Sequence, residues 1–195
     1  MRANSIMLQV IFVTVLVLWV GAISPVQAAS FYAAPQGTDI DSSPNLVGNP
    51  SFEIDTSGWN SSGGSVIQRI AGGLDGAYSL EMIGPTSTAT FGVTDHPNWV
   101  ATTPAAGTRY RFTAWVRSAV STGNARLRVR EYLNSVQQGS TTYSASVVLS
   151  PSWQMVTVDF VTRSAGSNLD LKVLDVPVTT GEVFQTDNIS IRIVP

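Results

Sequence analysis

The sequence of 195 residues carries 11 basic and 13 acidic residues, a single histidine and no cysteine. This length suits one domain with its own core, and the slightly negative balance argues against a nucleic-acid partner. Without cysteine the chain forms no disulfide, so stabilisation beyond packing has to come from another source, such as a bound metal ion.

The amino terminus has the pattern of a secretory signal peptide. Arg2 supplies a positive start, residues 6–23 are almost wholly apolar, and Pro25 ends this run before the small residues around Ala28. Signal peptidase cleaves after such a pattern. A membrane-spanning helix is the alternative, because the apolar run has nearly the length that crosses a bilayer. We expect a signal peptide over residues 1–28, a secreted, extracellular protein, and no membrane association after cleavage.

The rest of the chain divides into a lead-in and a β-rich domain. Residues 29–44 are small, polar and aperiodic, which indicates a linker or an extended lead-in. Short alternating segments follow, separated by Gly, Pro, Ser and Asn. The expected strands are 66–70, 79–83, 89–94, 110–117, 125–132, 143–149, 154–162, 169–173 and 188–194. Their number and spacing predict an all-β fold, an antiparallel β-sandwich or jelly roll, over residues 45–195.

The segments 110–117 and 125–132 carry the most informative pattern, because on each of them apolar and basic residues alternate. Side chains of a strand point alternately to its two faces. We expect the two strands to pair as a hairpin with their apolar faces in the core, which brings the remaining side chains onto one patch of one sheet. That patch would hold Arg109, Arg111, Trp115, Arg117, Arg126, Arg128, Arg130 and Tyr132.

This predicted patch has a structural and a functional interpretation. Charged outer faces that are solvated or paired internally are common on antiparallel sheets. The functional interpretation is that aromatic rings stack on sugar rings while guanidinium groups bind carboxylates or sulfates bidentately. It predicts binding of an acidic polysaccharide such as a polyuronate.

The other tryptophans carry less information. Trp99, in a loop-like stretch, is a further candidate for the rim of a glycan site, with packing over the sandwich edge as the alternative. Trp59 and Trp153 are expected to pack in the core.

Several segments in a fixed order resemble carbohydrate-binding modules appended to xylanases and glucanases. They are 45–53 (NLVGNPSFE) with 58–59 (GW), 75–80 (DGAYSL), 107–116 (GTRYRFTAWV), 153–160 (WQMVTVDF) and 184–191 (FQTDNISI). The resemblance covers residues 45–195 and implies a jelly roll of the galactose-binding-domain type that binds glycans without catalysis. A shorter stretch, 31–39, resembles the opening of secreted β-helix polysaccharide lyases, but no β-helix repeat follows it.

The same resemblance implies a structural Ca²⁺ near the two ends of the domain. Its ligands would be Glu53 and Asp187, with Ser51 as a further contributor and backbone carbonyls completing the shell. Ca²⁺ takes six to eight hard oxygen ligands, which these groups can supply. The alternative is that both carboxylates are ordinary turn residues.

The residues do not favour catalysis. His96 stands alone in a loop, and the chain lacks a nucleophile elbow and histidine spacing typical of a metal site. One alternative is a jelly-roll lyase in which Arg128 or Arg130 neutralises a uronate and Tyr132 moves the proton. Another is a cell-surface structural sandwich without a glycan ligand. We expect a non-catalytic, monomeric module that binds a polysaccharide.

Overall fold

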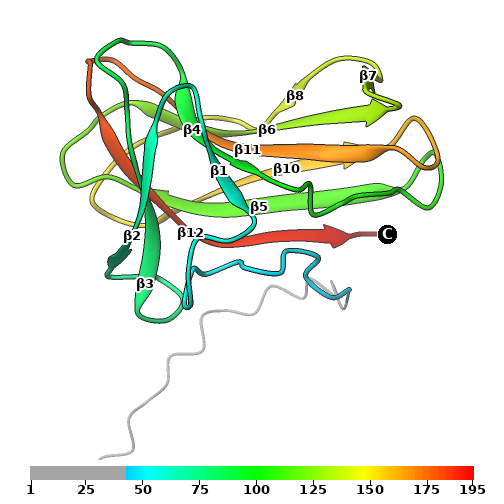
Figure 1. Ribbon diagram of the computed structural model, residues 1–195, viewed down its shortest axis with the longest axis horizontal. Coiled ribbons are helices and arrows are strands. Elements are labelled where there is room, and N and C mark those ends of the chain that lie inside the picture. The colour runs from blue at the N-terminus through cyan, green and yellow to red at the C-terminus, as the bar shows by residue number, and fades with distance from the viewer. Residues whose placement is uncertain (1–42) are drawn as a thin grey trace, which may run out of the picture. The chain divides into compact units, whose positions relative to one another are not determined.

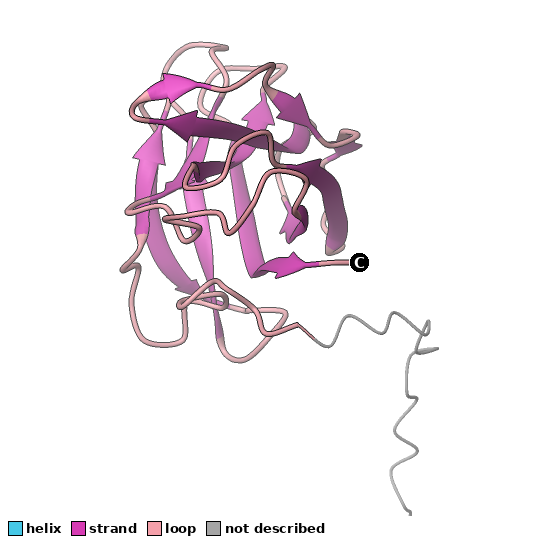
Figure 2. Ribbon diagram, turned by 90° about the vertical axis from the view of Figure 1, so that its right-hand side faces the viewer, coloured by secondary structure: helices cyan, strands magenta, loops and turns pink. Residues whose placement is uncertain are grey.

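A computed structural model of the protein describes residues 43–195, so the predicted signal peptide and most of the predicted lead-in lie outside the described residues. The described part consists of strands and loops (Figure 2). Within it, no helix is long and apolar enough to span a membrane.

The strands form two antiparallel sheets that face each other (Figure 1). The seven-stranded sheet has the order β1-β4-β11-β6-β7, and β8 and β9 also pair with β6. Its strands are β1 (Trp59–Ser62), β4 (Phe91–Asp95), β6 (Asn124–Leu133), β7 (Val136–Gln137), β8 (Thr142–Tyr143), β9 (Val147–Val148) and β11 (Asn168–Val176).

The five-stranded sheet has the order β10-β5-β12-β3-β2. Its strands are β2 (Val66–Ala71), β3 (Tyr78–Ile83), β5 (Arg109–Arg117), β10 (Gln154–Val161) and β12 (Val183–Ile193). The predicted all-β antiparallel sandwich is thus confirmed.

The core lies between the two sheets and follows from the alternation of side chains. On β5 the buried residues include Phe112 and Val116, and on β6 they include Leu127 and Val129. Each of these four is 0 % exposed. Burial of such a side chain stabilises the fold by about 2 kcal/mol relative to exposure. The same alternation turns the arginines of both strands outward.

The predicted hairpin between 110–117 and 125–132 is wrong, because β5 and β6 belong to opposite sheets. β5 pairs with β10 and β12, and β6 pairs with β11. The connection between them crosses the end of the sandwich, where Ser118 Oγ donates to Val183 O at 2.5 Å. The two apolar faces therefore meet across the core, and the two basic faces lie on opposite outer surfaces.

Smaller differences concern the edges of the strands. The predicted strand 143–149 is two short strands, β8 and β9, and β12 begins at Val183, well before the predicted start at residue 188. A register shift between Asp187 and Ser190 interrupts β12, and Asn188 has a positive φ of 45° there. This irregularity obscured the period of two in the sequence. Strands β1 and β7 were not predicted.

Candidate functional site

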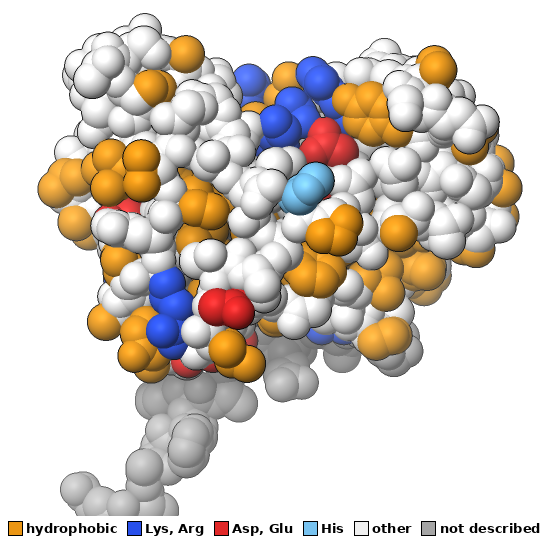
Figure 3. All heavy atoms as spheres, viewed as in Figure 1, with side chains coloured by type: hydrophobic (Ala, Val, Ile, Leu, Met, Phe, Trp, Pro, Cys, Tyr) orange, Lys and Arg blue, Asp and Glu red, His pale blue; other side chains and the backbone are white. Residues whose placement is uncertain are grey.

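The outer face of the seven-stranded sheet brings the basic side chains of β6 beside polar residues of its neighbours. Arg128 stands opposite Lys172 on β11 and Tyr143 on β8, and Arg130 stands opposite Asp170. We call this set the basic groove: Arg126, Arg128, Arg130, Tyr132, Tyr143, Asp170 and Lys172. Figure 3 shows basic side chains gathered in a hollow between two raised parts of the surface, next to an acidic side chain.

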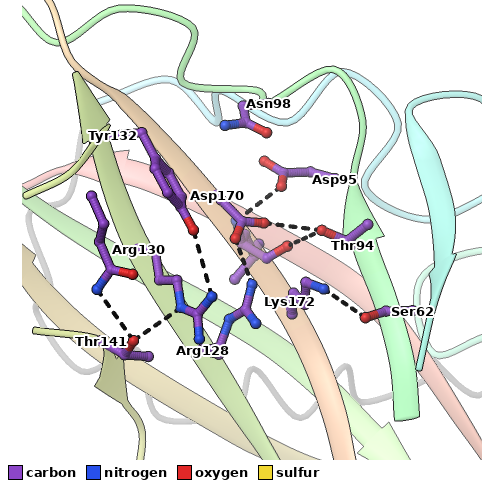
Figure 4. Close-up of polar contacts among 12 residues, drawn as sticks. Ser62, Thr94, Asp95, Asn98, Arg128, Arg130, Tyr132, Thr141, Asp170 and Lys172 are labelled. Carbon is purple, nitrogen blue, oxygen red and sulfur yellow. Dashed lines mark hydrogen bonds and ion pairs between the residues drawn. The ribbon is translucent and has the colours of Figure 1, made fainter. Parts of the chain in front are cut away.

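An ion pair on the groove floor fixes its centre. Arg128 Nη2 lies 2.5 Å from Asp170 Oδ2, and the two side chains are only 11 % and 16 % exposed. Thr94 on β4 donates through Oγ1 to Asp170 Oδ1 at 3.0 Å, as Figure 4 shows. Asp170 is therefore held in place by donors from both neighbouring strands.

The groove carries more cations than its acidic residue can balance. Within residues 43–195, this part of the face holds four cations, Arg126, Arg128, Arg130 and Lys172, and one carboxylate, that of Asp170. The Nε atoms of Arg126 and Arg128 are buried and have no hydrogen-bond partner in the described structure. Burial, and then the neighbouring Arg128, lower the pKa of Lys172 from its ordinary value. The groove therefore has unsatisfied positive charge.

Tyrosine rings and hydroxyl groups border these cations. The guanidinium of Arg126 lies 4.2 Å from the ring centroid of Tyr143, which is 42 % exposed. Arg130 donates through Nε to Thr141 Oγ1 at 2.9 Å and through Nη1 to the Tyr132 hydroxyl at 3.5 Å (Figure 4). Lys172 Nζ donates to Ser62 Oγ at 2.7 Å. These neutral partners orient the cations without neutralising them.

The groove continues toward a pocket beyond Asp170. This pocket of about 320 Å³ is lined by His96, Pro97, Asn98, Ala101 and Asn168. Asn168 stands opposite Tyr132, which joins the pocket to the groove. The Asn98 amide donates to Asn168 Oδ1 at 2.8 Å. The pocket thus adds neutral hydrogen-bonding groups to one end of the basic groove.

The arginines of β5 lie on the opposite sheet and have partners there. Arg109 and Arg111 both contact Asp159 on β10, at 3.1 and 2.8 Å. Hydrogen bonding from Arg111 lowers the pKa of Asp159. Arg117 donates to Gln185 Oε1 at 2.7 Å and to Gly72 O at 2.6 Å. The prediction of a single patch is therefore wrong, because the arginines of β5 and those of β6 lie on opposite outer surfaces of the sandwich.

The tryptophans also divide. Trp59 is buried, as predicted, and its ring centroid lies 6.2 Å from that of Trp99. Trp99 is half-buried against the core, so it covers the sandwich edge and is not an exposed rim residue. The prediction that Trp153 packs in the core is wrong, because Trp153 is half-buried and has the guanidinium of Arg117 4.4 Å from its ring centroid. Trp115 lies half-buried on the outer face of β5, away from the basic groove.

The predicted calcium ligands meet around one turn, residues 74–78. Glu53 accepts hydrogen bonds from Ala77 N and Tyr78 N at 3.0 and 2.9 Å, which lower its pKa. Asp187 accepts hydrogen bonds from the backbone N–H groups of residues 74 and 75, at 2.5 and 2.9 Å. Burial nevertheless raises the pKa of Asp187. Ser51 joins the cluster through its hydroxyl, which donates to Asp75 Oδ2 at 2.7 Å.

The donor set suits Ca²⁺ in kind, because carboxylate and hydroxyl oxygens are its preferred ligands. These carboxylates, however, already accept backbone N–H groups, and Arg69 donates to the carbonyls of residues 52 and 53. Among residues 43–195, no group of three or more His, Asp or Glu side chains is placed to hold a metal ion. Calcium at Glu53, Asp187 and Ser51 therefore stays a prediction.

Sequence reasoning missed three residues of the groove, namely Tyr143, Asp170 and Lys172. The alternation of Asp170 and Lys172 with buried Leu169, Leu171 and Val173 indicates that they face outward. It does not indicate which strand lies beside them. Only the pairing of β11 with β6 places the two residues next to the arginines.

Comparison with known proteins agrees with this architecture. The xylan-binding module CBM22-1 of Paenibacillus barcinonensis Xyn10C has a TM-score of 0.61 at 19 % identity, over 78 % of this chain and 96 % of that one. TmCBM61 in complex with β-1,4-galactotriose has a TM-score of 0.56 at 14 % identity, over 78 % and 100 %. Identities this low show the fold alone.

A third similar structure contains the CBM22-1 and GH10 modules of Clostridium thermocellum xylanase 10B in complex with xylohexaose. Its TM-score is 0.61 at 16 % identity over 75 % of this chain. The chain spans only 28 % of that protein. No curated protein sequence matches the chain. A family model described as a carbohydrate binding domain matches residues 44–175, about two thirds of the sequence, and the chain therefore belongs to the CBM_4_9 family of carbohydrate binding domains.

Proposed function

We propose that this chain is an exported, non-catalytic module that binds an acidic polysaccharide in the basic groove. Membership of the carbohydrate-binding family supports a polysaccharide ligand. The pattern of residues 1–28 supports export. The acidic character of the ligand is inferred from the groove residues themselves.

The observation that carries the proposal is the excess of cations over carboxylates in the groove. Asp170 balances one charge, while the buried Nε atoms of Arg126 and Arg128 have no acceptor in the described structure. A carboxylate or sulfate in the groove would form charge-assisted hydrogen bonds with the guanidinium groups and balance their charge. Uronate or sulfated sugars supply such acceptors, and the rings of Tyr132 and Tyr143 offer stacking surfaces.

Calorimetric titration with polygalacturonate, alginate and neutral xylan tests the proposal. We expect the acidic polymers to bind more tightly than xylan, and the difference to shrink as NaCl is raised because salt screens charge. Arg130→Gln removes one half-buried cation of the groove and should weaken acidic-polymer binding about tenfold. Arg117→Gln on the opposite sheet is the matched control and should leave the affinity unchanged.

Two outcomes would replace the proposal. Equal binding of xylan and the acidic polymers in both variants would move the site away from the arginines. Release of unsaturated uronate products, abolished by Tyr132→Phe, would make the chain a lyase, since Tyr132 and Arg130 are in contact.

A further inference from the structure

A second acidic site lies inside the end of the sandwich, away from the basic groove and from Glu53. Asp175, near the end of β11, stands between Ala125 on β6 and Phe91 on β4. Its side chain points inward and is 0 % exposed. Neither of its carboxylate oxygens accepts a hydrogen bond of good geometry in the described structure, although the backbone N–H groups of Asn124 and Val176 lie near enough to act against the rise of its pKa. A buried carboxylate with such weak donors is a costly arrangement that requires compensation.

Glu182 lies beside Asp175 and increases this cost. It is 4 % exposed and accepts hydrogen bonds through Oε1 from Val178 N and Thr179 N, at 2.8 and 2.7 Å. Its Oε2 accepts from Gly123 N at 3.0 Å. Burial, and then the charge of Glu182, raise the pKa of Asp175 to about 7. No ion pair of the described residues involves either carboxylate.

The two carboxylates converge on one position. A Cβ atom built on Gly123 would lie 2.2 Å from Asp175 Oδ1, 2.7 Å from Asp175 Oδ2 and 2.5 Å from Glu182 Oε2. Three carboxylate oxygens therefore crowd the space beside Gly123, and only glycine leaves room for them. Gly123 N donates to Glu182 Oε2, and converging carboxylate oxygens with so few donors form the type of cluster that hard cations bind.

We propose that Asp175 and Glu182 bind a divalent cation with a preference for oxygen ligands, Ca²⁺ first among them. The cation neutralises both buried carboxylates and satisfies the oxygens of Asp175, with backbone carbonyls and water completing its shell. It joins the end of β11, the connection before β12 and the start of β6. This site is separate from the predicted ligands Glu53, Asp187 and Ser51, and it does not depend on the glycan proposal.

The experiment measures Ca²⁺ bound after EDTA treatment and dialysis, together with the melting temperature in EDTA and in CaCl₂. In the full mature chain, CaCl₂ should raise the melting temperature by about 5 °C or more. Asp175→Asn should lose one bound Ca²⁺ per chain and that part of the stabilisation. Glu53→Gln, which alters only the other carboxylate cluster, should keep the Ca²⁺ that binds at Asp175 and Glu182 and its share of the stabilisation.

A shared proton is the outcome that would overturn the cation site. Asp175→Asn would then melt higher than the unaltered chain in metal-free buffer at alkaline pH, and both would bind equal amounts of Ca²⁺. Glu182→Gln serves if Asp175→Asn does not fold. A second measurement uses the unaltered chain: Ca²⁺ added at neutral pH should release protons from the Asp175–Glu182 pair, and an unchanged release in Glu182→Gln contradicts the proposal.

Discussion

Arg128 on β6 donates a hydrogen bond to Asp170 on β11, although Arg130 and not Arg128 stands directly opposite Asp170 in the ladder. The diagonal contact leaves Arg130 free to bond Thr141 and Tyr132. One carboxylate thus holds one cation at the groove floor while the next cation stays available near the surface. This division of roles gives the groove a fixed centre and an accessible charged side.

Asp170→Asn should separate stability from binding. The substitution leaves Arg128 buried without a counter-ion, so we expect a loss of about 2 kcal/mol in the free energy of unfolding. It also removes the only carboxylate of the groove, and acidic-polymer affinity should rise about fivefold. Urea unfolding and calorimetric titration measure the two effects. Asp159→Asn on the opposite sheet is the control and should change stability but not affinity. An unchanged affinity in both variants would contradict the proposal that the acidic polymer binds in the basic groove.

Glu131 should be the most sensitive acidic residue for folding. It is 0 % exposed and accepts hydrogen bonds from Arg163 N, Ser164 N and Ser167 Oγ, which hold the turn before β11. Glu131→Ala leaves these donors without an acceptor, and we expect a loss of about 3 kcal/mol in urea unfolding. Glu81→Ala is the comparison, because its carboxylate is half-exposed. Equal losses in the two variants would show that the turn does not need Glu131.

The fold could be predicted from the sequence because alternation on β5, β6 and β10 is local and regular. Alternation states which face of a strand is buried, but it does not state which strand lies beside it. Two apolar faces can share a core side by side or across it, and the arginines of β5 and β6 look the same in both cases. The partners Asp170 and Lys172 depend on a pairing between distant segments, which no local pattern contains.

The same limit applies to the buried carboxylates. Asp175 follows Leu174 at the end of an apolar strand, and its sequence context resembles that of a solvent-exposed strand end. Only the packing of the Glu182 connection and of Gly123 around it shows that it is enclosed. Glu53 and Asp187 were found through the resemblance to a family, and their contact with one turn needed the structure.

Stability should depend on pH through Asp95. Burial raises the pKa of Asp95 to about 7, although Leu171 N and Trp99 N donate hydrogen bonds to its carboxylate. The unfolded chain loses this proton near the ordinary value of 3.8. Between these two pH values the folded state holds a proton that the unfolded state has lost. The contribution of Asp95 to the free energy of unfolding is therefore full below about pH 4 and is lost as pH rises to about 7.

Asp95→Asn isolates that contribution, because an amide does not titrate. The variant loses one of the two hydrogen bonds and should be less stable at acidic pH, but its urea midpoint should fall less between pH 4 and pH 7. The measurement is the slope of the unfolding free energy against pH in both proteins. Identical slopes would mean that Asp95 stays ionised in the folded chain.

Calcium at Glu53, Asp187 and Ser51 should add stability to a turn that hydrogen bonds to these carboxylates already hold in place. Both carboxylates hold the turn 74–78 through backbone N–H groups, so metal removal should lower the melting temperature by a few degrees without unfolding the domain. The effect is best measured in Asp175→Asn, where the other proposed site is removed. Glu53→Gln combined with Asp175→Asn should abolish the remaining response to CaCl₂. If EDTA leaves the melting temperature of Asp175→Asn unchanged, Glu53 and Asp187 stabilise the turn through hydrogen bonds alone. Among the described residues, the cation at the backbone carbonyls of residues 52 and 53 is then the guanidinium of Arg69.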